Sequence, residues 1–355
     1  MKNRIFFLSP DNRHATGGVK QLYRQVDILN QNGFNAFILH KKIGHKSKFF
    51  KNNTQIKYNS KIFNDIRFHL KKINASKLKL IKLQFKNFKN NILSLTLKPF
   101  EIRFEESDIL VFPEIYGTAV TKIEKKLTKV IFNQNCYYSF DHFSVYSKLY
   151  NIPYLNNSVK ATIVASNDAF NYLNFTFPEL KLFRLRLGID ESVFNYSSNK
   201  KKQIAFMPRK LEEDVVQVIN ILKSRNNIKN WEFIPISNKN EIEVAQIMKE
   251  SAIFLSFNHR EGFGLPPAEA MACGCIVIGY TGKGGDEYFK EEFSYRVDDR
   301  DVIGFVKKIE NVIKQYDLNK NLMLDKSKKA SEFILNEYSL INEENDAIQI
   351  WKEIV

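Results

Sequence analysis

Residues 252–274 constrain the fold of this 355-residue chain more than any other stretch. An apolar run over residues 252–256 predicts a buried parallel strand. Gly262 and Gly264 follow, where backbone can approach a ligand closely. Pro266 and Pro267 suit the first turn of a helix, and Gly274 is placed to end that helix. Together, the strand, loop and helix N-terminus aim free N–H groups and a positive dipole end at one spot, which favours a phosphate group.

Two carboxylates frame this spot. Glu261 lies in the loop and Glu269 on the predicted helix, with seven residues between them. Ionised carboxylates accept hydrogen bonds, so they suit the hydroxyl groups of a ligand better than its phosphate. The alternative is a solvated loop residue and an ordinary glutamate on a helix surface. Their spacing around Gly-Phe-Gly-Leu-Pro-Pro favours the functional interpretation.

This stretch resembles the Glu–seven residues–Glu motif of the retaining, family 4 type glycosyltransferases, the glycosyl transferases group 1. The resemblance implies an α/β protein with the GT-B fold, in which the parallel sheets of two Rossmann-like domains face a cleft. It implies that Glu261 contacts the donor sugar and Glu269 the ribose hydroxyls of the nucleotide. The loop between them would hold the donor sugar and diphosphate through Gly262, Phe263, Gly264 and Leu265. Residues 279–288 also resemble the next strand and loop of the family.

A second part of the resemblance follows a predicted strand over residues 203–207. Relatives have an arginine at its end and a lysine about five residues later, and both grip the donor diphosphate. Arg209 matches, but Glu213 or Asp214 occupies the lysine position, so Lys210 is the candidate for the missing cation. Two cations fit this chemistry because a nucleoside diphosphate develops negative charge as it leaves.

The N-terminal half offers a weaker candidate. Residues 5–9 read as a first strand rather than as part of a signal peptide. Gly17 and Gly18 then precede an amphipathic helical pattern, which favours close ligand approach, although glycine before a helix is often only a turn. Family members have such a loop lining the cleft. A later strand, residues 129–132, ends where many relatives have histidine, and Asn135 or Gln134 is expected to contact the sugar instead.

Charge is distributed unevenly. The chain carries a net charge of +15, and residues 41–100 contain sixteen Lys and Arg but one acid, so the rest of the chain is balanced. We expect an acceptor domain over residues 1–190 that includes 41–100 as a basic insertion. A nucleotide-sugar domain should span 191–337, and a helix over 338–355 should pack back on the first domain.

The basic segment contains one pattern of its own. Its apolar positions recur at steps of three and four, typical of one helical stripe: Leu78, Ile81, Phe85, Phe88, Ile92 and Leu95. The same helix carries Lys77, Lys79, Lys82, Lys86 and Lys89. A basic amphipathic helix can lie on an anionic membrane surface. The alternative is that the stripe packs on the domain and the lysines face water.

Several classes of protein and site are disfavoured. No apolar run reaches about eighteen residues, so no membrane-spanning helix is expected. Three cysteines offer no disulfide framework, which favours the cytoplasm, with the inner face of the membrane as a further location. Asp301, in the one Asp-x-Asp triplet, is expected to cap a helix, so no metal and no cofactor beyond the substrate are predicted. Nucleic acid is not expected as a partner because no recognition motif accompanies the charge.

The resemblance implies transfer of a sugar from a nucleotide-diphosphate sugar to a glycan or lipid-linked acceptor, with retention of configuration, in surface polysaccharide synthesis. One alternative is a nucleotide-sugar epimerase of the same fold. Another is a non-catalytic basic protein that binds a surface. Intact Glu261 and Glu269 argue against a degenerate enzyme, whereas the missing lysine and histidine argue mildly for one.

Overall fold

A computed structural model describes residues 3–12, 17–48, 50, 52–72, 83–84, 86–87, 89, 100–141, 143, 145–146 and 152–355. The chain divides into two compact units. Unit 1 comprises Met1–Ala165, Ala169–Leu185 and Glu344–Val355, and unit 2 comprises Ser166–Asp168 and Arg186–Glu343. Each unit is built on one parallel sheet, which confirms the predicted α/β class.

The sheet of unit 1 has seven parallel strands in the order β3-β2-β1-β4-β5-β6-β7. They are β1 (Arg4–Leu8), β2 (Asn35–His40), β3 (Ile56–Tyr58), β4 (Ile109–Pro113), β5 (Thr128–Asn133), β6 (Val159–Val164) and β7 (Leu182–Arg184). Apolar runs such as Ile-Leu-Val-Phe in β4 are buried along their whole length, as expected for strands covered on both faces. The strand order reverses between β1 and β4, and ligands of such sheets bind outside the carboxyl ends at this point.

Helices and short 3-10 turns cover this sheet. They are α1 (Gly17–Gln31), α2 (Ser60–Lys72), α4 (Asn167–Thr176), η2 (Glu114–Thr121), η3 (Cys136–Tyr138) and η5 (Pro153–Leu155). Residues 41–100 were predicted as an insertion, and the structure differs there. β3 pairs with β2 at the sheet edge, and α2 buries Ile62 and Ile66 in the core. This part of the basic segment therefore belongs to the domain itself.

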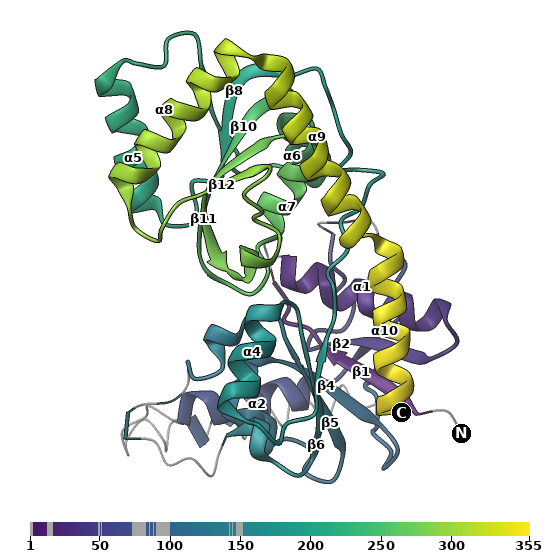
Figure 1. Cartoon of the computed structure of the whole chain (residues 1–355). Coiled ribbons are helices and arrows are strands. Elements are labelled where there is room, and N and C mark those ends of the chain that lie inside the picture. Colours follow the sequence, from purple (N-terminus) through teal and green to yellow (C-terminus); the bar gives the residue numbers. More distant parts are fainter. Residues whose placement is uncertain are drawn as a thin grey trace. The chain divides into compact units, whose positions relative to one another are not determined.

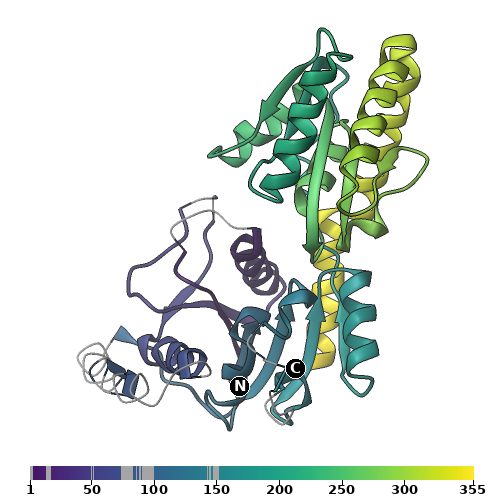
Figure 2. The same ribbon diagram turned by 90° about the vertical axis from the view of Figure 1, so that its left-hand side faces the viewer.

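The C-terminal helix α10 (Leu340–Ile354) contributes its later residues to unit 1. Trp351 is buried, with its ring centroid 5.7 Å from that of Phe7 on β1. Lys160 on β6 donates a hydrogen bond to the carbonyl of Ile354. Figures 1 and 2 both show this helix, in yellow, alongside the strands of unit 1. Aromatic packing thus fixes the end of the chain against the first strand.

Unit 2 has five parallel strands in the order β12-β11-β10-β8-β9, with the reversal between β8 and β10. The strands are β8 (Lys201–Phe206), β9 (Glu232–Pro235), β10 (Ser251–Glu261), β11 (Ile276–Lys283) and β12 (Ser294–Arg296). Helices α5 (Glu212–Arg225) and α8 (Val302–Leu318) lie side by side on one face (Figure 1). The other face is covered by α6 (Glu241–Glu250), α7 (Leu265–Ala272) and α9 (Lys320–Glu337).

The predicted strands of unit 2 are present, but β10 extends to Glu261, so this residue ends a strand and does not lie in the loop as predicted. The run over residues 252–256 is the buried centre of β10, between β8 and β11. Asp301 caps α8 as predicted, because its Oδ1 accepts the Gly304 N–H at 2.8 Å. None of the helices in the described part of the chain is long and apolar enough to cross a membrane.

Candidate functional site

Two predicted site residues meet at the reversal of strand order in unit 2. Lys210 follows the end of β8, and Glu261 is the last residue of β10. The Lys210 ammonium forms an ion pair with the Glu261 carboxylate. The lysine side chain is 43% exposed and the glutamate side chain 16% exposed, so the pair is open to a ligand. Arg209 is exposed next to them, with no ion pair or hydrogen bond found for its side chain among the described residues.

The glycine loop ends at the N-terminus of α7. Gly264 has φ +83° and caps this helix, and no side chain supplies a cap hydrogen bond. Leu265, Pro266 and Pro267 form the first turn, as the sequence predicts. A helix N-terminus without a side-chain cap leaves backbone N–H groups for water or a ligand, and its dipole favours an anion. The helix N-terminus predicted from the sequence is present, and its use as an anion site stays a prediction.

Two buried side chains lie under this loop. The Tyr288 hydroxyl donates to the carbonyl of Gly264 at 2.6 Å and lies 3.1 Å from that of Phe263. Asn258 is 6% exposed, and its Nδ2 has no hydrogen-bond partner in the described part of the chain. A Cβ at Gly264 would lie 2.5 Å from that nitrogen, so only glycine fits there. Buried amides normally have partners, so this orphaned donor is a candidate contact for a bound molecule.

Glu269 lies on α7 one turn after Leu265, and residues four apart share a helix face. It is partly exposed, whereas Ala268 and Ala270 on either side are fully buried. The helix ends as predicted near Gly274, which has φ +80° and donates to the Met271 carbonyl at 2.8 Å. This Schellman ending fixes the length of the helix that carries Glu269.

The two acids at the lysine position of relatives belong to another cluster. Glu213 and Asp214 lie in the first turn of α5, and Arg300 pairs with them at 2.6 and 2.9 Å. Asp214 is buried, whereas Glu213 is exposed. Sequence reasoning missed Arg300 because it lies 86 residues from Asp214 and follows no predicted strand end.

The candidate residues of unit 1 gather at the reversal between β1 and β4. Gly17 and Gly18 begin α1, and the Gln134 side chain after β5 donates to the Gly18 carbonyl at 3.2 Å. The Oδ1 of Asn135 accepts the Tyr137 N–H at 3.1 Å and so caps η3. That acceptor is therefore used in local structure, and the role of Asn135 at the donor sugar stays a prediction.

A buried carboxyl holds these strand-end residues. Glu114, just after β4, accepts the backbone N–H of Gln134 at 3.0 Å, and the N–H of Asn135 also bonds to it. Burial raises the pKa of Glu114 to about 7 even though these hydrogen bonds favour the ionised form, and the charge of Asp141 adds to the rise. Sequence reasoning did not single out Glu114, because nothing local to Pro-Glu-Ile predicts a fully buried side chain.

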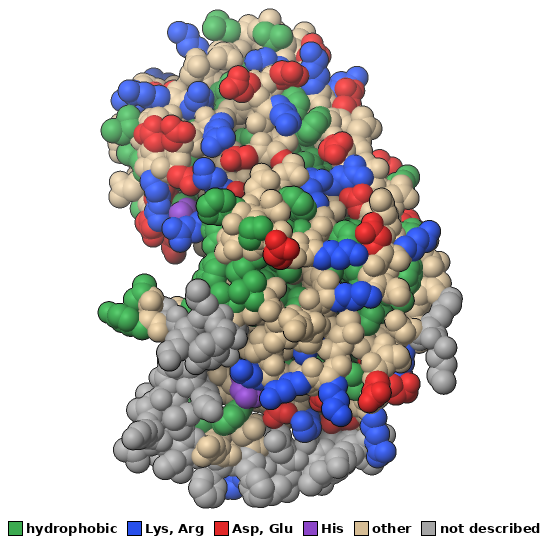
Figure 3. Space-filling model, turned by 60° about the horizontal axis from the view of Figure 1, so that its bottom comes forward, with side chains coloured by type: hydrophobic (Ala, Val, Ile, Leu, Met, Phe, Trp, Pro, Cys, Tyr) green, Lys and Arg blue, Asp and Glu red, His purple; other side chains and the backbone are tan. Residues whose placement is uncertain are grey.

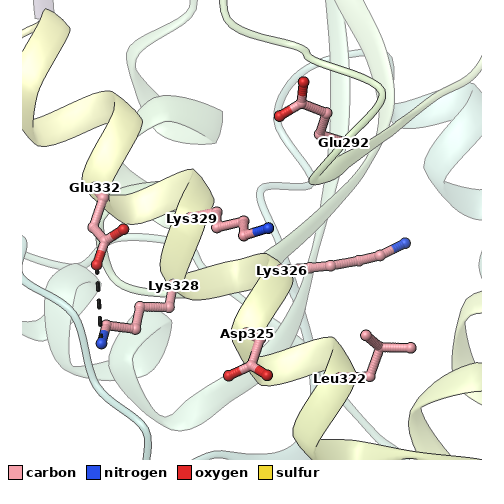
Figure 4. A pocket seen from close by; sticks show the side chains of 7 residues that line it. All are labelled: Glu292, Leu322, Asp325, Lys326, Lys328, Lys329 and Glu332. Atoms are coloured by element: carbon pink, nitrogen blue, oxygen red, sulfur yellow. Dashed lines mark ion pairs between the residues drawn. The ribbon is translucent and has the colours of Figure 1, made fainter.

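Two other regions do not contribute to these sites. A recess along α9 is lined by charged side chains and shares none of the predicted site residues (Figure 4). Its lining consists of Glu292, Leu322, Asp325, Lys326, Lys328, Lys329 and Glu332. The predicted basic amphipathic helix lies mostly outside the described residues. Of its stripe and lysine positions, only Lys86 and Lys89 are described.

Comparisons with known proteins agree with this geometry. Residues 211–329 match the family model described as glycosyl transferases group 1, a segment that contains the glycine loop and both glutamates. A curated protein of Actinobacillus pleuropneumoniae serotype 7 (strain AP76), named alpha-1,6-glucosyltransferase, is 28% identical over 195 residues. That match covers 51% of this chain and 55% of the relative, so it spans about half the length of the curated protein.

Solved structures show the same fold over nearly the whole chain. Sucrose-phosphate synthase from Thermosynechococcus elongatus is similar with a TM-score of 0.66 at 12% identity, and 99% of each chain is covered. HepE of Anabaena, solved in complex with UDP-glucose, is similar with a TM-score of 0.64 at 12% identity, again over 99% of each chain. The two parallel sheets and these neighbours confirm the GT-B fold. The chain is therefore similar to the glycosyl transferases group 1 over residues 211–329 and shares the GT-B fold of these neighbours.

Proposed function

We propose that this chain is a glycosyltransferase that moves a sugar from a nucleotide-diphosphate sugar to a glycan or lipid-linked acceptor. The name of the curated relative and the UDP-glucose bound to one structural neighbour support a nucleotide sugar as donor. The observation that carries the proposal is the meeting of Lys210 and Glu261 at the strand reversal of unit 2. This point lies at the carboxyl ends of β8 and β10, where the ligands of such sheets bind.

The diphosphate fits the cationic side of this site. Arg209 and Lys210 would stabilise the charge that develops as the nucleoside diphosphate leaves, together with the N–H groups that begin α7. Lys210 must then divide its interaction between the diphosphate and Glu261. The lysine side chain is 43% exposed, so its ammonium group is accessible to a diphosphate while it is paired with Glu261.

The two glutamates fit the hydroxyl-bearing parts of the donor. Glu261 is placed to accept hydrogen bonds from the sugar, and Glu269 from the ribose. Phe263, Gly264 and Leu265 lie between them, so one donor would span the loop from sugar to nucleoside. The unpartnered Nδ2 of Asn258 offers a further donor beneath the loop.

We propose retention of anomeric configuration without a metal at the diphosphate. In this account the rate enhancement comes from positioning and from stabilising the leaving group, with no protein nucleophile. Lys210 and Arg209 would replace the charge that a metal supplies in other transferases. Asp301, the end of the Asp-x-Asp triplet, is occupied as the cap of α8.

We assign the acceptor to unit 1, at the carboxyl ends of β1 and β4. Gly18 and Gln134 form a hydrogen-bonded rim there, which exposes backbone and amide groups of the kind that bind sugar hydroxyls. These groups recognise a polyhydroxylated acceptor rather than an apolar one. Asn135 stays a candidate contact of the donor sugar.

The excess of basic residues supports a location at the cytoplasmic face of an anionic membrane. The one acid of residues 41–100, Asp65, is paired with Lys61 at 2.8 Å, so it neutralises none of the other bases. On the face shown in Figure 3, basic and acidic side chains are interspersed over the described surface, without one broad basic patch. The attraction would therefore depend on residues 73–99, which carry the lysines of the predicted helix.

A thermal-shift screen with nucleoside diphosphates tests the donor assignment. A ligand at 100 times its Kd stabilises the folded protein by about 2.7 kcal/mol, so one diphosphate should raise the Tm well above the others. The matching nucleoside without phosphates should raise it less. If no nucleoside diphosphate shifts the Tm, the donor site is refuted. If the donor is converted without any acceptor, the epimerase alternative is favoured.

A further inference from the structure

Three potential metal ligands lie together in unit 1, apart from the residues used above. Asp11 follows β1, His40 is the last residue of β2, and His45 lies in the loop after it. One ligand atom from each lies within 4.8 Å of the other two. Adjacent parallel strands end at the same edge of the sheet, so the register of β1 and β2 brings the first two residues together.

Asp11 and His40 are held firmly in place. The Nδ1 of His40 lies 2.9 Å from Asp11 Oδ1, and its Nε2 lies 2.6 Å from the Tyr23 hydroxyl. That hydroxyl also accepts the Ser47 N–H at 3.1 Å. The Asp11 carboxylate additionally accepts the backbone N–H groups of the two residues after His40, at 3.3 and 3.1 Å. Both ligands are therefore oriented before any ion binds.

The ring of His45 lies beside this hydrogen-bond network but takes no part in it. Its ring packs edge-on against the His40 ring, with centroids 4.5 Å apart. No hydrogen bond to its ring nitrogens occurs within the described residues, although the ring is half-buried. One of its ring atoms lies within 4.8 Å of a ligand atom of both Asp11 and His40, so the ring is placed to bind the same ion as they do.

The cluster presents one carboxylate and two imidazoles. These are typical zinc ligands, and imidazole also suits copper and nickel.

We propose that Asp11, His40 Nδ1 and His45 bind a divalent transition-metal ion of the zinc class. The ion would take the place of the proton between His40 and Asp11. His40 would then carry its proton on Nε2, where the Tyr23 oxygen is the partner that orients the ring. Three protein ligands leave the fourth tetrahedral position open for water or another oxygen ligand.

The site is independent of the proposed donor site, which lies in unit 2. The three ligand atoms lie within 4.8 Å of one another, and one ion bound at about 2.0–2.1 Å would draw the most distant of them closer together. His45 is placed to make this movement because it lies in a loop, whereas β2 fixes His40.

Zinc titration of the full chain, with any purification tag removed and after dialysis against a chelator, tests the proposal. Competition with a chromophoric chelator should give one Zn²⁺ per chain. Tyr23→Phe should weaken binding about 10- to 100-fold, as expected for loss of a group that orients a ligand. His45→Ala and Asp11→Asn should weaken it by more than Tyr23→Phe does.

His69→Ala is the matched control, because His69 lies on α2 outside the cluster and its removal should leave zinc binding unchanged. Circular dichroism confirms folding of each variant, and Asp11→Asn decides the outcome if His45→Ala does not fold. Nucleoside diphosphate binding by His45→Ala should equal that of the wild type, which separates this test from the donor assignment. Absence of zinc binding by the wild type, or equal affinity in the wild type and the cluster variants, overturns the proposal.

Discussion

Replacing Glu114 by glutamine should change how the stability of unit 1 depends on pH. The Glu114 carboxyl is buried, and its pKa rises from an ordinary value of 4.5 to about 7 on folding. Folding therefore binds a proton between these pH values. The stabilisation is complete below about pH 4.5 and is lost as pH rises through about 7. At 1.36 kcal/mol per pKa unit, the loss amounts to about 3 kcal/mol.

Glu114→Gln removes the titrating group but keeps one side-chain oxygen that can accept the Gln134 N–H. The difference in free energy of unfolding between variant and wild type should therefore rise by about 3 kcal/mol between pH 4.5 and pH 8. Urea unfolding measures it, with Trp351 as the fluorescent reporter of unit 1 in a Trp231→Phe background. Glu106→Gln, an exposed carboxyl of the same unit, is the control and should follow the wild type. A constant difference between Glu114→Gln and wild type across this range would show that Glu114 takes up no proton on folding.

Three further predictions follow from the site and the charge distribution. Arg209→Ala should weaken nucleoside diphosphate binding by about 1.5–3 kcal/mol in titration calorimetry and should weaken nucleoside binding much less. Lys229→Ala is the control. Equal losses for both ligands would exclude a contact between Arg209 and the diphosphate. Tyr288→Phe leaves the buried carbonyl of Gly264 without its donor, so urea unfolding followed at Trp231 should show a loss of about 1–3 kcal/mol, and no loss would contradict that role. Sedimentation of the protein with anionic vesicles should fall steeply as salt is raised. It should disappear when five lysines are replaced by Gln: Lys77, Lys79, Lys82, Lys86 and Lys89. Equal binding to neutral vesicles would show that these lysines only face solvent.

The sequence predicts what local chemistry determines. Glycine before α7, prolines in its first turn and Gly274 after it specify the loop and the helix without reference to the rest of the chain. Asp301 caps α8 for the same reason. Apolar runs specify β10 and β4 because a strand covered on both faces needs them. The strand that ends at Glu261 and the helix that carries Glu269 were therefore predictable.

Contacts between distant strands were not predictable from local chemistry. Lys210 and Glu261 are 51 residues apart, and they meet only because β8 and β10 are neighbours in the sheet. Gln134 reaches Gly18 across 116 residues for a similar reason, and Asn135 is used as a cap that the sequence does not reveal. Sheet order, rather than any motif, decides these partners.

The basic segment shows how composition can conceal structure. β3 is three residues long, Ile56–Tyr58, so it is too short to give a periodic signal within a lysine-rich run. It forms because the edge of β2 is open to pairing over Ile38–His40. The prediction of an insertion over all of residues 41–100 is wrong at β3 and α2, because the charge of this segment does not reveal that β3 pairs with β2 and that α2 packs in the core.

Titration calorimetry on Glu269→Ala tests whether a nucleotide-sugar donor is held across the glycine loop. If Glu269 binds the ribose, loss of this charge-assisted hydrogen bond should weaken nucleoside diphosphate binding by about 1.5–3 kcal/mol, or roughly 10- to 150-fold. Binding of pyrophosphate, which has no ribose, should be unchanged, and the exposed control Glu291→Ala should match the wild type for both ligands. Unchanged nucleoside diphosphate affinity in a folded Glu269→Ala protein would show that Glu269 does not bind the ribose.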